Sequence, residues 1–190
     1  MRWNLPILLT WLRMLAIPLL VLVYLLPGEP ASMPARNLIG TVVFVAAAVT
    51  DWFDGWLARR LGQTTAFGAF LDPVADKLLV CAALVLLLDL QRVDALVAVI
   101  IVGREIAISA LREWMAGMGA RRSVAVHSIG KLKTVAQLVA IPMLLYHQPL
   151  FGVVPVQRIG TWLIWVAALL TLWSMFYYLR QAWPLLRDAS

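Results

Sequence analysis

The sequence predicts an all-α membrane protein with six transmembrane helices. Hydrophobic residues make up 63% of the 190 residues and charged residues only 14%, and the mean hydropathy is +0.87. Apolar runs of about 20 residues, the length that a helix needs to cross the hydrocarbon core, are separated by Gly, Pro and charged residues. This composition excludes an ordinary soluble domain, because no soluble core of this size needs so much apolar material.

Each apolar run defines one span, and we expect the six to form a single polytopic domain over residues 1–190. The first run follows a basic residue as a secretion signal would, but Arg13 interrupts it and no convincing cleavage site follows. We therefore expect a retained helix, whose first turns from Trp3 to Arg13 lie along the membrane interface. The six predicted spans are residues 7–26, 37–58, 70–89, 94–116, 131–147 and 158–182.

The basic residues predict the orientation of these spans. They concentrate at the chain start, after the second span, in the loop after the fourth span and at the chain end, which all fall on one side. The positive-inside rule makes this side cytoplasmic, together with both termini. The net charge of +6 favours contact with anionic lipid headgroups, and not nucleic acid, because the basic residues are spread among the spans and no nucleic-acid motif is present.

Four aspartates lie in the string DWFDGWLARRLGQTTAFGAFLDPVAD, at the end of the second span and the start of the third. Asp51 and Asp54 are three residues apart and Asp72 and Asp76 four apart, so each pair lies on one face of its helix. Charges at membrane depth are costly, and converging carboxylates repel unless a cation lies between them. Oxygen ligands suit Mg²⁺ or Mn²⁺, and no nearby His or Cys cluster favours zinc. The sequence therefore predicts a divalent-metal site.

The whole string resembles the signature of the CDP-alcohol phosphotransferases, membrane enzymes that make phospholipids from CDP-activated donors. The resemblance implies the fold of that family, a transferase activity that depends on Mg²⁺ or Mn²⁺, with two ions, and a homodimer with one site in each protomer. The matching positions are Asp51, Asp54, Gly55, Ala58, Arg59, Gly68, Asp72 and Asp76.

The same resemblance implies a role for each residue of the string. Asp51, Asp54 and Asp72 become the main metal ligands, and Asp76 becomes the catalytic base and a further ligand. The CDP group is expected against Asp54, Gly55, Ala58, Arg59 and Gly68.

The residue types of the string suit these roles. Gly55 and Ala58 leave room for a phosphorylated ligand near the helix backbone, and Arg59 offers a fork of donors to phosphate oxygens. Gly68 is expected in a loop that closes over the nucleotide. The alternative is that the aspartates form ion pairs with neighbouring cations to fix helix packing, which does not explain the small residues at these intervals.

Polar residues outside the string bear on the acceptor alcohol. The fourth span carries Glu105, Ser109 and Arg112 on one stripe, and basic residues open the next span. They favour a cationic pocket for a phosphate on the acceptor, with the candidate residues Arg112, Ser128, Lys131 and Lys133. Two alternatives remain open: the lysines follow the positive-inside rule alone, and Glu105 pairs with Arg112. For Arg104, acceptor contact and a structural ion pair are both open.

Two further stretches, NLPILLTWLRMLAIP and GREIAISALREWMAGMGARRSVAVHSIGKLKTVAQ, resemble the bacterial branch of the family that uses glycerol 3-phosphate. This implies transfer of a phosphatidyl group from CDP-diacylglycerol to sn-glycerol 3-phosphate, giving phosphatidylglycerophosphate and CMP, at the cytoplasmic face of the bacterial inner membrane. Two other functions remain open. One is the same chemistry with inositol phosphate or phosphatidylglycerol as acceptor, and the other is a non-enzymatic cation or proton transporter that uses the intramembrane acids.

Overall fold

The chain forms six helices in the computed structural model, which describes residues 5–26, 32–61, 66–117 and 128–188. Inside these ranges the structure does not describe some of the side chains, among them those of residues 54–59 and 128–131. The all-α fold is confirmed, and every predicted span coincides with a helix. The helices are α1 (Leu5–Leu25), α2 (Met33–Leu61), α3 (Ala66–Asp89), α4 (Ala95–Gly117), α5 (Ser128–Tyr146) and α6 (Val156–Asp188).

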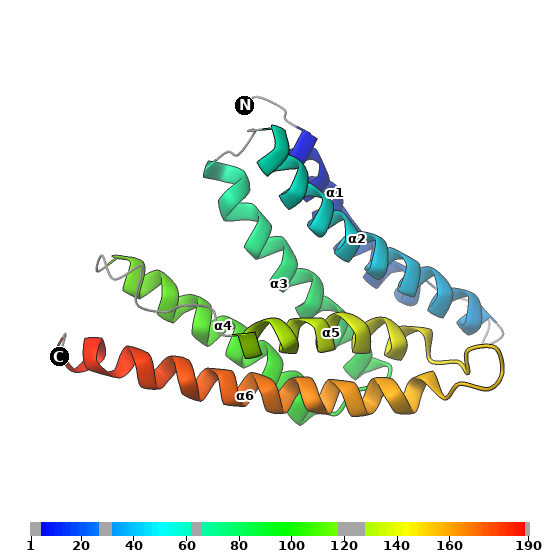
Figure 1. The fold of residues 1–190 in the computed structure, drawn as a ribbon. Helices are drawn as coiled ribbons and strands as arrows, with labels where there is room; N and C mark the ends of the chain where they lie inside the picture. Colours follow the sequence, from blue (N-terminus) through cyan, green and yellow to red (C-terminus); the bar gives the residue numbers. More distant parts are fainter. Residues whose placement is uncertain (1–4, 27–31, 62–65, 118–127, 189–190) are drawn as a thin grey trace.

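The helices form two groups that meet near the middle of the molecule (Figure 1). In one group α1 packs against both α2 and α3, and in the other α6 packs against both α4 and α5. Contacts of α2 with α5 and of α3 with α4 and α5 join the groups. The start of α1, the end of α2 and the start of α3 lie at the same end of the first group (Figure 1). This arrangement brings the two aspartate pairs to one end of three neighbouring helices.

Two glycines allow neighbouring helices to approach closely. A Cβ atom at Gly40 of α2 would lie 2.7 Å from ring and hydroxyl atoms of Tyr24 on α1. At Gly160 of α6 it would lie 3.0 Å from Leu144 on α5. Small residues at such points let helix backbones come together, as they do in other membrane helix pairs. The pairs α1–α2 and α5–α6 are therefore packed more closely than larger side chains would permit.

A core of apolar side chains joins the two groups of helices. Outside it, large apolar side chains also point away from the protein on each of the six helices, for example Leu15, Val42, Val85, Val99 and Leu169. An exposed apolar surface of this extent suits contact with lipid acyl chains. The largest apolar side chains that are fully buried among the described residues are Phe44, Leu20, Leu84, Leu87, Ile101, Ile141, Leu144, Leu145, Ile164 and Val97.

Several apolar helices mark the chain as a membrane protein. Among the described residues, three segments are long and apolar enough to cross a membrane: Leu8–Leu25, Met33–Asp51 and Val156–Trp183. Leu132–Tyr146 is apolar but shorter. Charged residues interrupt the apolar stretches of α3 and α4, so these two helices are not among the three segments. The expectation that α3, α4 and α5 also cross the bilayer therefore rests on the sequence pattern.

The described part of the segment that is predicted to lie at the membrane interface, Leu5 to Arg13, forms the first turns of α1. Helix α1 is continuous from Leu5 to Leu25, and Trp3 lies outside the described residues. Thr10 and Arg13 are fully buried, so this part of α1 packs against the rest of the protein. The reason is that its two polar side chains contact the aspartates of α2 and α3, as described below.

A partly buried arginine ties the helices together at their other end. Arg92, in the connection from α3 to α4, donates through Nη1 to the carbonyl oxygens of Leu144 (3.2 Å) and Leu145 (2.7 Å). Its Nη2 donates to Oδ1 of Asn37 on α2 (2.8 Å). The carbonyl groups in the last turn of a helix have no partner within that helix, so Arg92 caps α5 and anchors it to α2.

Candidate active site

Carboxylates from two helices converge on one arginine. Nη1 of Arg13 lies 2.6 Å from Oδ1 of Asp51, on α2, and 2.6 Å from Oδ1 of Asp76, on α3. The two carboxylate oxygens therefore lie within twice that distance of each other. The sequence prediction that Asp51 and Asp76 come together across two helices agrees with this geometry.

A second polar residue of α1 reaches a third aspartate. The hydroxyl of Thr10 donates a hydrogen bond of 2.7 Å to Oδ1 of Asp72. Thr10 and Arg13 are three residues apart and so lie on one face of α1. That face contacts three of the four aspartates of the string, while the remainder of α1 is mostly apolar.

The carboxylates are open on one side and covered on the other. The side chains of Asp51 and Asp76 are 38% and 46% exposed, whereas that of Arg13 is 0% exposed. The arginine thus approaches from the protein interior, and the carboxylate groups keep a surface from which a ligand can reach them.

The donor set suits a hard divalent cation, because it consists of carboxylate oxygens from two helices. Among the described side chains, no group of three or more acidic, His or Cys residues forms a ready-made metal site. The side chain of Asp54, the fourth predicted ligand, lies outside the description. The metal site therefore stays a prediction, to which the converging carboxylates of Asp51 and Asp76 lend support.

Most residues predicted to bind CDP have side chains that the structure does not describe. Gly55, Ala58 and Arg59 all belong to α2, in its last two turns. The prediction of a loop at Gly68 is wrong, because α3 already begins at Ala66 and includes this glycine. A single glycine lowers helix stability by only about 1 kcal/mol relative to alanine. The alanine and apolar residues on both sides of Gly68 therefore suffice to continue the helix across it.

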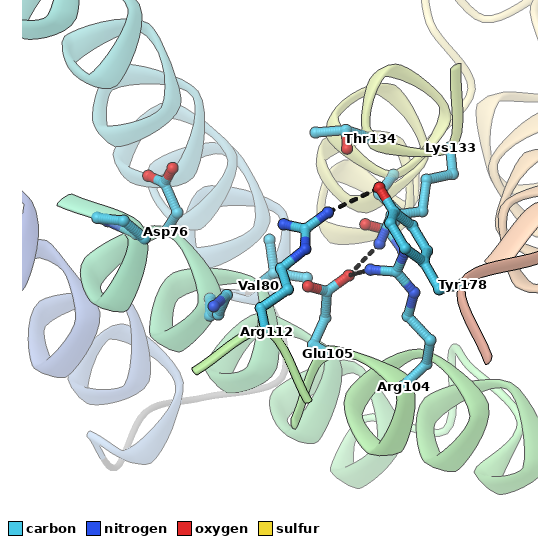
Figure 2. Close-up of a pocket in the computed structure, with 11 residues that line it drawn as sticks. Asp76, Val80, Arg104, Glu105, Arg112, Lys133, Thr134 and Tyr178 are labelled. Carbon is cyan, nitrogen blue, oxygen red and sulfur yellow. Dashed lines mark hydrogen bonds and ion pairs between the residues drawn. The ribbon is translucent and has the colours of Figure 1, made fainter. Parts of the chain in front are cut away.

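A cavity of about 250 Å³ opens beside Asp76 and lies among α3, α4, α5 and α6 (Figure 2). Four cationic side chains line it, against the two carboxylates of Asp76 and Glu105. The excess of positive charge suits an anionic ligand of small size. The cationic residues are Lys77, Arg104, Arg112 and Lys133, and the other lining residues include Thr134, Gln137 and Tyr178.

Glu105 neutralises part of this positive charge. Its Oε1 accepts hydrogen bonds from Nζ of Lys133 and from Nη1 of Arg104, the latter at 3.2 Å. Arg104 also donates to the hydroxyl of Ser174 on α6 at 3.1 Å. Lys133 and Arg104 are only 5% and 6% exposed, and buried charges need such partners. For Arg104, the sequence left two roles open, and the structure assigns it both an ion pair and a place in the cavity wall.

Arg112 has a neutral partner. Its Nη2 donates a hydrogen bond of 2.7 Å to the hydroxyl of Tyr178, and Figure 2 shows it extending between Asp76 and Tyr178. The suggested pair of Glu105 with Arg112 is not among the described ion pairs, in which Glu105 contacts Arg104 and Lys133 instead. Among the described residues, no carboxylate forms an ion pair with Arg112, so its guanidinium is well placed for an anionic ligand. Of the other predicted acceptor residues, Lys133 lines the cavity, and the side chains of Ser128 and Lys131 lie outside the description.

Comparison with known proteins identifies the family. A model of the CDP-alcohol phosphatidyltransferases matches residues 3–173, which is most of the chain. The chain belongs to the CDP-alcohol phosphatidyltransferase family. The resemblance that the aspartate string suggested is thereby confirmed.

Relatives within the CDP-alcohol phosphatidyltransferases are similar along nearly their whole length. Proteins of Salmonella choleraesuis (strain SC-B67), Shigella flexneri serotype 5b (strain 8401) and Escherichia coli (strain K12) are each 50% identical over 184 residues. The match covers 96% of this chain and 96% of each relative. All three are named CDP-diacylglycerol–glycerol-3-phosphate 3-phosphatidyltransferase.

Sequence reasoning missed several residues that contact the candidate site of this CDP-alcohol phosphatidyltransferase, among them Thr10, Arg13, Lys77 and Tyr178. Arg13 had a usable signal, because a charge inside an apolar run needs a partner. Thr10, three residues before it, shares its helix face. Tyr178 had no such signal, because a tyrosine near the end of an apolar helix is routine at a membrane interface.

Proposed function

We propose that this chain transfers the phosphatidyl group of CDP-diacylglycerol to sn-glycerol 3-phosphate and releases CMP. The observation that carries the proposal is the cavity in which Asp76 shares one space with Arg104, Arg112 and Lys133. It offers one carboxylate to a reacting hydroxyl and several cations to a phosphate. The names of the relatives, which specify glycerol 3-phosphate as the acceptor, support the same substrate here.

The proposed reaction exchanges one phosphorus–oxygen bond for another. The 1-hydroxyl of glycerol 3-phosphate attacks the phosphorus that carries diacylglycerol, and the bond from this phosphorus to the oxygen of CMP breaks. The hydroxyl proton passes to the carboxylate of Asp76, which acts as general base. Phosphatidylglycerophosphate stays in the bilayer and CMP leaves.

Asp51, Asp54, Asp72 and Asp76 are the proposed ligands of Mg²⁺ or Mn²⁺, with two ions. When bound, such ions neutralise the diphosphate and stabilise the leaving phosphate. The open side of Asp51 and Asp76 supports access for the metal and the diphosphate. The proposed contacts of the CDP group are Asp54, Gly55, Ala58, Arg59 and Gly68.

The acceptor phosphate is proposed to lie against Arg112 and Lys133, with Ser128 and Lys131 nearby in the chain. Arg112 is best suited, because its described partner is the neutral hydroxyl of Tyr178, and a guanidinium can donate two parallel hydrogen bonds to a phosphate. Lys133 shares its charge with Glu105. An acceptor without a phosphate, such as the cation choline, would gain nothing from this excess of positive charge.

The assembly and location are proposed on the family resemblance. We propose a single polytopic domain, a homodimer with one site in each protomer, and a place in the bacterial inner membrane with the site facing the cytoplasm. The basic residues at the site end of the helices support this orientation.

The proposal is tested with purified protein in lipid nanodiscs, given labelled CDP-diacylglycerol and Mg²⁺ or Mn²⁺ together with one acceptor at a time. We expect CMP release and a labelled lipid with glycerol 3-phosphate, and no product with inositol phosphate or phosphatidylglycerol. A product with another acceptor alone would change the assigned substrate. Ion flux without any release of CMP would favour the transporter hypothesis instead.

A further inference from the structure

Helix α1 directs two polar side chains at the aspartates and otherwise contributes little polar surface. Arg13 contacts Asp51 and Asp76 through a single nitrogen, and Thr10 donates to Asp72. Both residues are buried, at 0% and 1% exposure. The bonds from Thr10 to Asp72 and from Arg13 to Asp76 each join residues more than 60 positions apart in the chain, so neither results from local helix geometry.

A buried guanidinium in this place needs a physical reason. An arginine removed from water destabilises the fold strongly unless it is paired and hydrogen-bonded. Its pairing here links a carboxylate at the end of α2 to one near the start of α3. Because neighbouring carboxylates repel each other, a fixed cation between these two oxygens holds together helix ends that would otherwise separate.

The direction from which Arg13 approaches separates it from a ligand-binding residue. The guanidinium lies on the buried side of the carboxylates, whereas the aspartates themselves are partly exposed. A metal ion can therefore reach the carboxylates from the open side while Arg13 and Thr10 hold them from behind. Partners of this kind orient the ligating groups, and their loss typically lowers metal affinity by about 10- to 100-fold.

We propose that Arg13 and Thr10 are positioning residues, which set the separation and orientation of Asp51, Asp72 and Asp76 for a divalent cation. This inference rests on the metal site of the proposed function. It extends that site to a third helix, because α1 supplies no ligand but determines how tightly the metal is held.

The test measures Mn²⁺ binding without any substrate, from the electron paramagnetic resonance signal of free Mn²⁺ in titrations of the protein in nanodiscs. We expect Arg13→Gln to raise the Kd for Mn²⁺ by about 10- to 100-fold and Thr10→Val to raise it by about tenfold. Arg13→Lys keeps a cation that can contact both carboxylates, so its Kd should lie between those of the unaltered chain and Arg13→Gln.

Two control variants remove polar groups that are wholly or partly buried and are not among the described contacts of the four aspartates. Arg92→Gln removes a partly buried arginine that caps α5, and Thr171→Val removes a buried hydroxyl that donates within α6. Both controls should lower thermal stability and leave the Kd for Mn²⁺ unchanged. This pattern separates a positioning role from a merely structural one.

An unchanged Kd in Arg13→Gln and Thr10→Val, with loss of stability alone, would overturn the inference. Tighter binding in Arg13→Gln would also overturn it, because the arginine would then compete with the metal. If Arg13→Gln does not fold, Thr10→Val decides, since it preserves shape. Failure of the unaltered chain to bind Mn²⁺ is a different result, which would remove the proposed metal site and the inference with it.

Discussion

The hydroxyl of Tyr178 on α6 accepts a hydrogen bond of 2.7 Å from the guanidinium of Arg112 on α4. The same tyrosine ring lies beneath two guanidinium groups, with its centroid 4.9 Å from Cζ of Arg112 and 5.6 Å from Cζ of Arg104. Such contacts are attractive because the face of an aromatic ring is negative. Helix α6 therefore orients both arginines of the cavity, although the cationic groups themselves come from other helices.

This relationship predicts the effect of Tyr178→Phe. The ring remains, but the hydrogen bond that orients Arg112 is lost. This loss costs about 1 kcal/mol of free energy, which corresponds to roughly a fivefold change in the affinity for glycerol 3-phosphate. We expect the KM for glycerol 3-phosphate to rise by about that factor, with kcat and the KM for CDP-diacylglycerol little changed. Steady-state kinetics with each substrate varied in turn measures both.

The neighbouring tyrosine is the control for that variant. Tyr177 accepts a hydrogen bond of 2.8 Å from Gln181 on the same helix, and it does not line the cavity. Tyr177→Phe should leave the KM for glycerol 3-phosphate unchanged. Equal effects of the two variants would show that the change acts through α6 in general and not through Arg112.

Asp76→Asn should separate chemistry from donor binding. The amide has nearly the shape of the carboxylate but cannot take up the hydroxyl proton, and general base catalysis contributes about 10²- to 10⁴-fold. We expect kcat for CMP release to fall by at least that much, while binding of CDP-diacylglycerol, followed by calorimetry, largely survives. Asp89→Asn, at the exposed far end of the same helix, is the control and should keep full activity. Substantial CMP release by Asp76→Asn would assign the base elsewhere.

Glu105→Gln should destabilise the protein through the charges that it leaves unpaired. Lys133 and Arg104 are nearly buried and share this carboxylate, and breaking a buried pair costs about 3–5 kcal/mol. We expect a loss of this size in reversible unfolding in detergent, partly restored by added glycerol 3-phosphate, whose phosphate replaces the missing negative charge. Glu113→Gln, an exposed position on the same helix, should change stability little. No restoration by glycerol 3-phosphate would argue against a phosphate site in this cavity.

The parts of this fold that depend on local sequence were predictable, and so was the reaction family. Apolar runs gave the six helices because the length of a span is set by the bilayer. The spacing of Asp51, Asp54, Asp72 and Asp76 predicted two faces that could converge, because helical periodicity is a local property. Gly68 misled the prediction, since a glycine near a polar connection indicates a loop unless its apolar neighbours continue the helix.

Contacts between helices could not be predicted from the sequence. Thr10 contacts Asp72, 62 residues away, and Arg13 contacts Asp76, 63 residues away. Only the packing of α1 against α2 and α3 determines which side chains meet. The same holds for Glu105, which contacts Lys133 across 28 residues while Arg112, on its own helix, contacts Tyr178. Spacing along one helix shows which residues share a face, but it does not show what that face meets.

Close packing of α1 against α2 predicts a stability difference between two glycine substitutions. At Gly40 an added methyl group would lie 2.7 Å from Tyr24, and overpacking of this kind costs about 1–3 kcal/mol. At Gly103 no atom lies within 4 Å of the added group, and alanine favours a helix by about 1 kcal/mol over glycine. We therefore expect Gly40→Ala to lower the free energy of unfolding and Gly103→Ala to leave it equal or higher. Unfolding titrations of both variants in the same detergent measure the difference. The double variant Gly40→Ala with Tyr24→Leu should recover part of the lost stability, because it removes the ring that the methyl group meets. A loss at Gly103 as large as at Gly40 would contradict close helix contact as the cause.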